Sequence, residues 1–111
     1  GIEITEFTVA PQVNPEDGSL PYHEWFVEFA KAPEDMERFR LNVDAALQQK
    51  NVYYFDLIEG KILQPLIIRN LEKDAFIKYM RSKGKLGGQN KVPRLSNDRN
   101  IAAELAGYIK K

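Results

Sequence analysis

The sequence predicts an α+β domain in which a small sheet of about three or four strands is flanked by helices. Two early stretches, residues 2–10 and 22–29, show the alternation or the aromatic content typical of strands. Residues 34–50 and 72–83 instead repeat apolar side chains every three or four positions, as amphipathic helices do. We expect one domain, residues 1–111, with the order strand, strand, helix, short helix, strand, helix, loop, helix.

The first two strands are expected to pair as an antiparallel hairpin. In residues 2–10, side chains such as Ile2 and Ile4 recur at every second position, which is the period of a strand. Proline, asparagine, aspartate and glycine then gather in residues 11–18 and predict a long loop. The chain resumes as an aromatic-rich strand over residues 22–29.

Two helices are expected next, over residues 34–50 and 51–59. Pro33 and the two acidic residues after it suit the first turn of a helix, where negative charge is favourable. Residues 51–59 fit either a strand or a short helix, and we interpret them as a helical turn that ends at Gly60.

The C-terminal part is expected to add a strand and two helices. Residues 62–71 suit a buried strand, and Pro65 indicates a sheet edge or a strand start. The helix over 72–83 is expected to end at Gly84. A last helix should follow the capping oxygens of residues 96–98. Four apolar residues mark it: Ile101, Leu105, Tyr108 and Ile109.

The composition excludes several kinds of site and partner. Without cysteine the chain forms neither disulfides nor thiolate metal sites, and we expect a cytoplasmic setting. No apolar run approaches the length of a membrane span, so no membrane partner is expected.

The charge distribution suggests an anionic partner. The net charge is zero, yet residues 1–59 carry 12 acidic and 4 basic residues (net −8), and residues 60–111 carry 4 acidic and 12 basic residues (net +8). This asymmetry favours a basic face, unless the two halves neutralise each other in the fold.

The only histidine and the aromatic residues around it are interpreted as structural. No nucleophile motif accompanies His23, and the acidic residues lack the spacing of a metal site. The aromatic residues of the second strand could stack on bases. Alternation, however, places Glu24 and Glu28 on the same face as Tyr22 and Phe26. Two carboxylates would repel a phosphate backbone, so packing in the core is favoured.

A basic, glycine-rich loop over residues 83–98 is the candidate functional segment. Glycines at positions 84, 87 and 88 would let backbone N–H groups approach an anion, and Pro93 restrains the chain just beyond Lys91. Phosphate or carboxylate binding is the chemistry that this pattern favours, although its spacing fits neither a P-loop nor a dinucleotide fingerprint. A solvated basic loop is the alternative. Four basic residues lie here with no acidic residue between them: Lys83, Lys85, Lys91 and Arg94.

Residues 89–94, Gln-Asn-Lys-Val-Pro-Arg, resemble the Gln-x-Lys-x-Pro-Arg signature of the plant auxin-responsive GH-three family of acyl acid-amido synthetases. The string of residues 82–99 is similar to that of bacterial relatives, and residues 4–11, 22–25 and 33–35 also resemble their segments. The resemblance implies the small C-terminal lid domain of an adenylate-forming enzyme, excised from a longer protein. Val92 departs from the plant members, which commonly have threonine there.

By this resemblance the longer protein would be an ATP-dependent ligase, and this chain alone would be inactive. A carboxylic acid would attack ATP to give an acyl-adenylate and pyrophosphate, and an amine such as an amino acid would then take the acyl group. Mg²⁺ would accompany ATP, and the partner would be the large N-terminal domain. Lys91 would be the catalytic lysine that meets the α-phosphate. Nucleotide or phosphate contacts would come from five residues: Lys85, Gly87, Gly88, Gln89 and Arg94.

Three alternatives stay open at this point. Arg94 could instead anchor the loop to an acidic residue of the first half, and we favour that role for it. The whole chain could be a free-standing basic module that binds RNA or DNA, or a non-catalytic interaction domain. The residues favour the synthetase domain over both, with nucleic acid the less expected partner.

Overall fold

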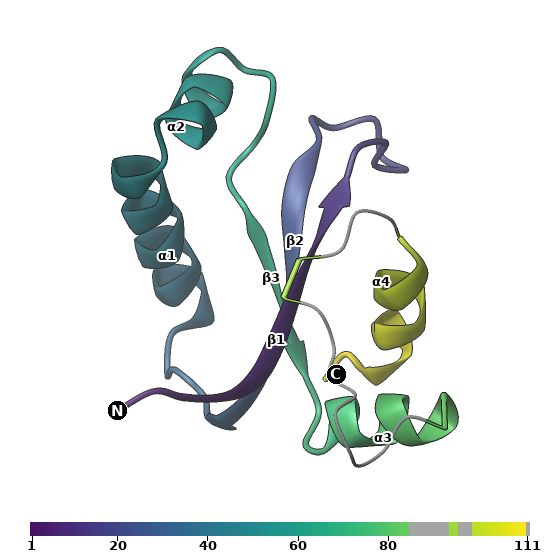
Figure 1. The fold of residues 1–111 in the computed structure, drawn as a ribbon. Helices are drawn as coiled ribbons and strands as arrows, with labels where there is room; N and C mark the ends of the chain where they lie inside the picture. Colours follow the sequence, from purple (N-terminus) through teal and green to yellow (C-terminus); the bar gives the residue numbers. More distant parts are fainter. Residues whose placement is uncertain (85–93, 96–98, 111) are drawn as a thin grey trace.

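The computed structural model describes residues 1–84, 94–95 and 99–110, which form a three-stranded sheet with helices on both of its faces (Figure 1). The predicted α+β class and order of elements are confirmed. None of the helices in these ranges is long and apolar enough to cross a membrane. In chain order the elements are β1 (Glu3–Gln12), β2 (Tyr22–Lys31), α1 (Met36–Lys50), α2 (Val52–Glu59), β3 (Ile67–Leu71), α3 (Ala75–Ser82), α4 (Asn100–Leu105) and the 3-10 turn η1 (Ala106–Tyr108).

The strand order is β1-β2-β3, so β2 is the central strand. β1 pairs antiparallel with β2, as predicted for the hairpin, and Thr8 lies opposite Phe26. β2 pairs parallel with β3, because the chain crosses over through α1 and α2 before it returns to the sheet. β3 begins at Ile67, two residues after Pro65, and lies at the edge of the sheet. The edge position indicated by Pro65 is confirmed, but the strand predicted over residues 62–71 starts five residues late and is mostly half-buried, because it has only one neighbouring strand.

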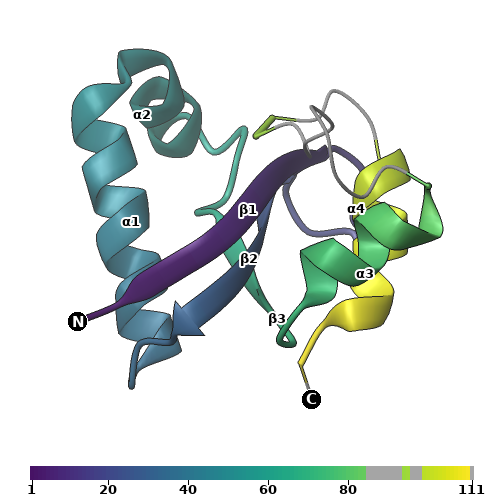
Figure 2. The same cartoon turned by 60° about the horizontal axis from the view of Figure 1, so that its bottom comes forward.

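The helices form two layers, with α1 and α2 on one face of the sheet and α3 and α4 on the other (Figure 1 and Figure 2). Neighbouring side chains of a strand point to opposite faces, so Phe26 packs towards α3 and α4 whereas Phe29 contacts Phe39 of α1. Burial of apolar surface in the α3-α4 layer is the main favourable term that holds this layer on the sheet. Its core cluster consists of Ala10, Phe26, Leu71, Ala75, Phe76, Tyr79, Ala102 and Leu105.

Asn51 separates the two helices that lie between β2 and β3. Its backbone N–H donates to the carbonyl oxygen of Leu47 (2.9 Å), which ends α1, and its side chain accepts from the N–H of Tyr54 (3.1 Å), which begins α2. Gly60 follows as the C-cap, so the helical interpretation of this segment is confirmed. At the other end of α1, Asp35 accepts from a backbone N–H of the first turn, and the helix starts two residues later than predicted.

The C-terminal helices are shorter than predicted. α3 begins at Ala75, three residues late, and is followed by Gly84, whose φ of 68° suits the glycine expected at this end. α4 passes into η1, and Ile109 forms an antiparallel bridge with Leu71. The prediction of Ile109 as a helical residue is wrong, because the chain there pairs with β3 and satisfies groups of that edge strand. The predicted capping residues 96–98 lie outside the described residues.

Candidate functional site

Most of the predicted site residues lie outside the described part of the chain. Lys91 and four of the predicted phosphate-binding residues, Lys85, Gly87, Gly88 and Gln89, belong to residues 85–93. Arg94 is the predicted site residue that the structure describes. The candidate site can therefore be built from the described side chains on the two borders of the loop.

At the N-terminal border, Lys83 follows α3 and is paired with α4. Its ammonium nitrogen lies 2.5 Å from a carboxylate oxygen of Glu104, and this hydrogen bond raises the pKa of the lysine. The two side chains are 40 % and 43 % exposed, so the pair adds little to stability. The ion pair instead connects the end of α3 to α4, close to where the loop begins.

At the C-terminal border, Arg94 is held by β1. Its Nη1 lies 2.7 Å from Oε1 of Glu6, and its guanidinium carbon lies 4.6 Å from the centroid of the Phe7 ring. The N–H of Val9 donates to the carbonyl oxygen of Arg94 (2.9 Å), and Leu95 forms a parallel bridge with Val9. Arg94 and Leu95 therefore cover part of the free edge of β1. The arginine side chain is still 59 % exposed.

Beyond the loop, Arg99 is attached to the sheet through Glu24 of β2. The Glu24 side chain is 6 % exposed, and its two oxygens bind different arginines, each at 2.6 Å: Oε1 accepts from Nη2 of Arg99, and Oε2 from Nε of Arg69 on β3. Arg69 also donates to the hydroxyl of Tyr22 (3.3 Å), and Arg99 to the carbonyl oxygen of Pro11 (3.4 Å). Burial alone would lower the pKa of Arg69, but the hydrogen bond and the charge of Glu24 outweigh it and raise this pKa.

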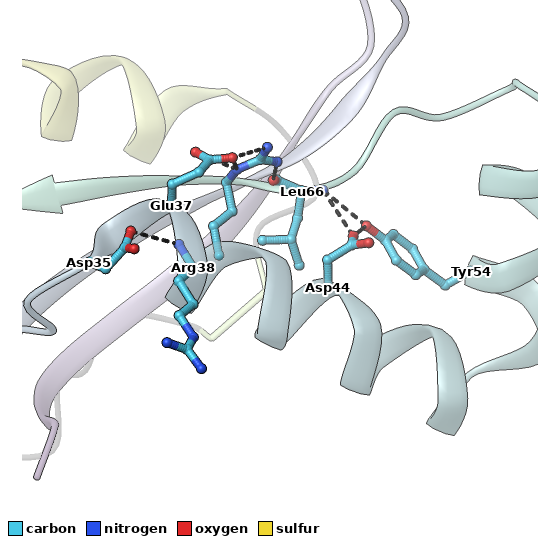
Figure 3. A network of polar contacts seen from close by, with 7 residues as sticks. Asp35, Glu37, Arg38, Asp44, Tyr54 and Leu66 are labelled. Atoms are coloured by element: carbon cyan, nitrogen blue, oxygen red, sulfur yellow. Dashed lines mark hydrogen bonds and ion pairs between the residues drawn. The ribbon is translucent and has the colours of Figure 1, made fainter.

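A second polar network lies in the α1-α2 layer (Figure 3). Asp44 of α1 is buried and accepts from the hydroxyl of Tyr54 on α2. The N–H of Leu66 donates both to Oδ1 of Asp44 (3.2 Å) and to the hydroxyl oxygen of Tyr54 (3.0 Å). The carbonyl oxygen of Leu66 accepts from Nη1 of Arg40 (2.6 Å). These contacts fix the chain just before β3, and burial together with the Asp44 carboxylate raises the pKa of Tyr54.

The aromatic residues of β2 are packed rather than presented as a platform. Phe26 is 1 % exposed, and Trp25 stacks on Phe7 with ring centroids 5.6 Å apart. Glu24 and Glu28, expected on the same face as Phe26, are both buried in the α3-α4 layer. The core interpretation is therefore confirmed, and the two carboxylates are part of it.

Several polar residues of these networks were not predicted, among them Asp44, Arg69 and Arg99. Asp44 carries a sequence signal, since it lies three residues before Leu47 on the apolar side of a helix. Arg69 directly follows the apolar residues 66–68 within a strand, which is a weaker signal of the same kind. Arg99 carries no signal in the sequence, because its partner Glu24 is 75 residues away in the chain. Within the described ranges, no group of three His, Asp or Glu side chains could hold a metal ion.

Comparison with known proteins identifies relatives of this fold. Residues 1–100 match the family described as "GH3 family C-terminal domain". No curated protein gives a significant match. Among solved structures, "GH3.15 acyl acid amido synthetase" superposes with a TM-score of 0.77 at 18 % identity, over 99 % of this chain and 20 % of that one. A second structure, "AtGH3.15 acyl acid amido synthetase in complex with 2,4-DB", gives a TM-score of 0.66 at 17 % identity, over 99 % of this chain and 21 % of that one. The chain thus spans about a fifth of the length of these synthetases.

Proposed function

Because this chain belongs to the GH3 family as a C-terminal domain, we propose that it is the small domain of a larger ATP-dependent acyl acid amido synthetase. The observation that carries the proposal is the family match over residues 1–100, since this range contains the complete segment 89–94 with Lys91. The one-fifth share of the matched synthetases agrees with a domain that works beside a large N-terminal domain. A cytoplasmic setting and a bacterial source stay predictions.

The proposed reaction has two steps. A carboxylate oxygen of the acyl acid attacks the α-phosphate of ATP, so that an acyl-adenylate forms and pyrophosphate leaves. The nitrogen of an amine, such as an amino acid, then attacks the acyl carbon, and AMP leaves as the amide forms. Mg²⁺ would be held with ATP by groups of the large domain.

Lys91 is the residue that we assign to the chemistry. Negative charge accumulates around the α-phosphate as it becomes five-coordinate, and an ammonium group there stabilises the transition state more than the bound substrates. The backbone N–H groups of Gly87 and Gly88, together with Lys85 and Gln89, would contact the other phosphate oxygens. This assignment rests on the family signature.

The described residues on both borders of the loop are held by ion pairs. Lys83 is paired with Glu104 on one side, and Arg94 is paired with Glu6 and packed over Phe7 on the other. Because Arg94 keeps more than half of its side chain exposed in this arrangement, it can anchor the loop and still offer donors to a phosphate. Both roles proposed for Arg94 are compatible with these contacts.

The test uses the full-length protein and measures pyrophosphate release with ATP and a panel of carboxylic acids. Replacement of Lys91 by alanine should slow this release by about 10²- to 10³-fold, the usual loss for a group that stabilises transition-state charge. The matched control is Lys50→Ala, which removes an exposed lysine from the last turn of α1. Normal pyrophosphate release by Lys91→Ala, with the control also normal, would refute the role of Lys91.

A further inference from the structure

We propose that Arg69 and Arg99, here called the arginine pair, form a second anion site that binds a phosphate-bearing ligand. The pair joins two distant parts of the chain, since Arg69 is in β3 and Arg99 directly precedes α4. Both guanidinium groups bind the same carboxylate, Glu24, through different oxygens and at the same distance of 2.6 Å. The two groups are therefore held next to each other by a single buried anion.

Among the described residues, the charges in this cluster do not cancel. Two permanently charged guanidinium groups share one carboxylate, which leaves one positive charge in excess. The carboxylate is buried, whereas the side chains of Arg69 and Arg99 are 36 % and 37 % exposed. The excess positive charge therefore faces solvent, and the compensating negative charge lies behind it in the α3-α4 layer.

Hydrogen-bonding capacity also remains. A guanidinium group has five N–H donors, and the contacts among described residues use two from Arg69 and two from Arg99. Those contacts, with Glu24, the Tyr22 hydroxyl and the Pro11 carbonyl oxygen, fix both planar groups in place. Because the side chains are ordered before a ligand arrives, less conformational entropy is lost on binding.

A phosphate group suits this arrangement better than a carboxylate. It carries up to two negative charges and has several acceptor oxygens in a tetrahedral arrangement, so one group can accept from two neighbouring guanidinium groups. The ligand could be free inorganic phosphate or pyrophosphate, or the phosphate chain of a nucleotide. These sources share their chemistry, and the experiment separates them.

The experiment measures binding by calorimetry to the 111-residue chain at low and constant ionic strength, with inorganic pyrophosphate, inorganic phosphate and ATP as separate probes. Replacing either arginine of the pair by alanine should weaken binding of the best probe at least tenfold. Arg38→Ala, which removes the same charge from α1 on the other face of the sheet, should leave binding unchanged. Tighter binding of pyrophosphate than of ATP identifies a free anion as the ligand, and the reverse order identifies a nucleotide.

Three further variants make the result decisive. If an alanine variant fails to fold, as judged by circular dichroism, Arg69→Lys and Arg99→Lys keep the charge but lose the planar fork and should still weaken binding several-fold. Glu24→Gln should also weaken binding, because a neutral amide no longer holds two guanidinium groups together. Tighter binding by Glu24→Gln would show that simple charge attraction, rather than a fixed arginine pair, is responsible. Absence of binding by the unmodified chain, or equal losses in Arg38→Ala, would overturn the site.

The site can be separated from the proposed catalytic loop. Binding is measured without turnover, so loss of synthetase activity in Lys91→Ala does not bear on it. Lys91→Ala removes only what the loop contributes to anion binding, so the part of the binding that depends on Arg69 and Arg99 should remain in this variant. If binding were instead lost in that variant and kept in both arginine variants, the loop would be the anion site and the arginine pair would not.

Discussion

Asp44 of α1 and Tyr54 of α2 are joined by a hydrogen bond from the tyrosine hydroxyl to the carboxylate, and both residues are buried. The backbone N–H of Leu66, just before β3, donates to both of these groups. Three segments thus meet at one carboxylate, and the position of the parallel edge strand depends on two helices. Buried polar groups are costly when they lose their partners, so this network is a sensitive point for stability.

Replacing Asp44 by alanine should lower the free energy of unfolding by about 2–4 kcal/mol, because the Tyr54 hydroxyl and the Leu66 N–H lose a buried acceptor. Tyr54→Phe keeps the ring and should cost less, about 1–2 kcal/mol. Urea denaturation measures both changes. The matched control is Asp56→Ala on the exposed side of α2, which should change stability by under about 0.5 kcal/mol. An equally small change for Asp44→Ala would show that the network is not stabilising.

His23 should make the stability of the chain depend on pH. Burial beside the Tyr54 ring, 5.3 Å away, lowers the pKa of His23 from its ordinary value of 6.5, and the charge of Asp44 opposes this shift only in part. Between the lowered pKa and 6.5, the unfolded chain binds more protons than the folded chain, so stability falls as the pH falls through this window. Unfolding free energies from urea titrations should therefore be smaller near about pH 5 than near about pH 7.5.

The control for this dependence is His23→Gln, which keeps a polar side chain but cannot titrate in this range. The variant should show a flatter pH profile above about pH 5, where the carboxylates are still largely ionised. Identical profiles for the two proteins would show that His23 binds protons equally well in both states.

Local signals in the sequence were enough to predict most elements. Asn51 and Gly60 mark the limits of α2, and the alternation of β2 places Glu24 and Glu28 on one face. What these carboxylates bind was not predictable, because their partners are about 45 to 75 residues away and no local pattern encodes such contacts. The extent of the last helix was overestimated for the same reason, since pairing with β3 redirects Ile109. Lys91, the centre of the predicted site, lies outside the described residues and stays a prediction.

Glu6→Gln tests whether the contact with Arg94 matters for the proposed function of the loop. The pair is partly exposed, so its loss should lower stability by less than about 1 kcal/mol. In the full-length protein, pyrophosphate release should nevertheless slow several-fold, because Arg94 loses the anion that holds it at β1. Glu37→Gln breaks another ion pair, with Arg40 at 2.7 Å in the other layer, and should leave the rate unchanged. Equal rates for Glu6→Gln and the unmodified enzyme would contradict an anchoring role.

We expect the side chain of Glu28 to cap the N-terminus of α3. This buried carboxylate of β2 accepts from the backbone N–H groups of Asp74 (2.9 Å) and Phe76 (3.1 Å), and the helix has no side-chain cap from its own N-cap residue. Glu28→Ala leaves two N–H groups without an acceptor and should lower the free energy of unfolding by about 2–3 kcal/mol. Glu28→Gln retains one carbonyl oxygen and should lose about half as much, on the order of 1 kcal/mol.

Hydrogen exchange distinguishes this capping role from a general effect of removing a buried acid. In Glu28→Ala the amides of the first turn of α3 should lose protection more than the amides of α1, because the lost acceptor served that turn. Glu16→Ala removes an exposed acid from the β1-β2 loop and should change neither region. Asp74 adopts a left-handed φ of 65°, so Asp74→Gly should relieve backbone strain and recover up to about 1 kcal/mol in the Glu28→Ala background. If Glu28→Ala instead lowered protection equally in both layers, the carboxylate would support the sheet as a whole rather than the start of α3.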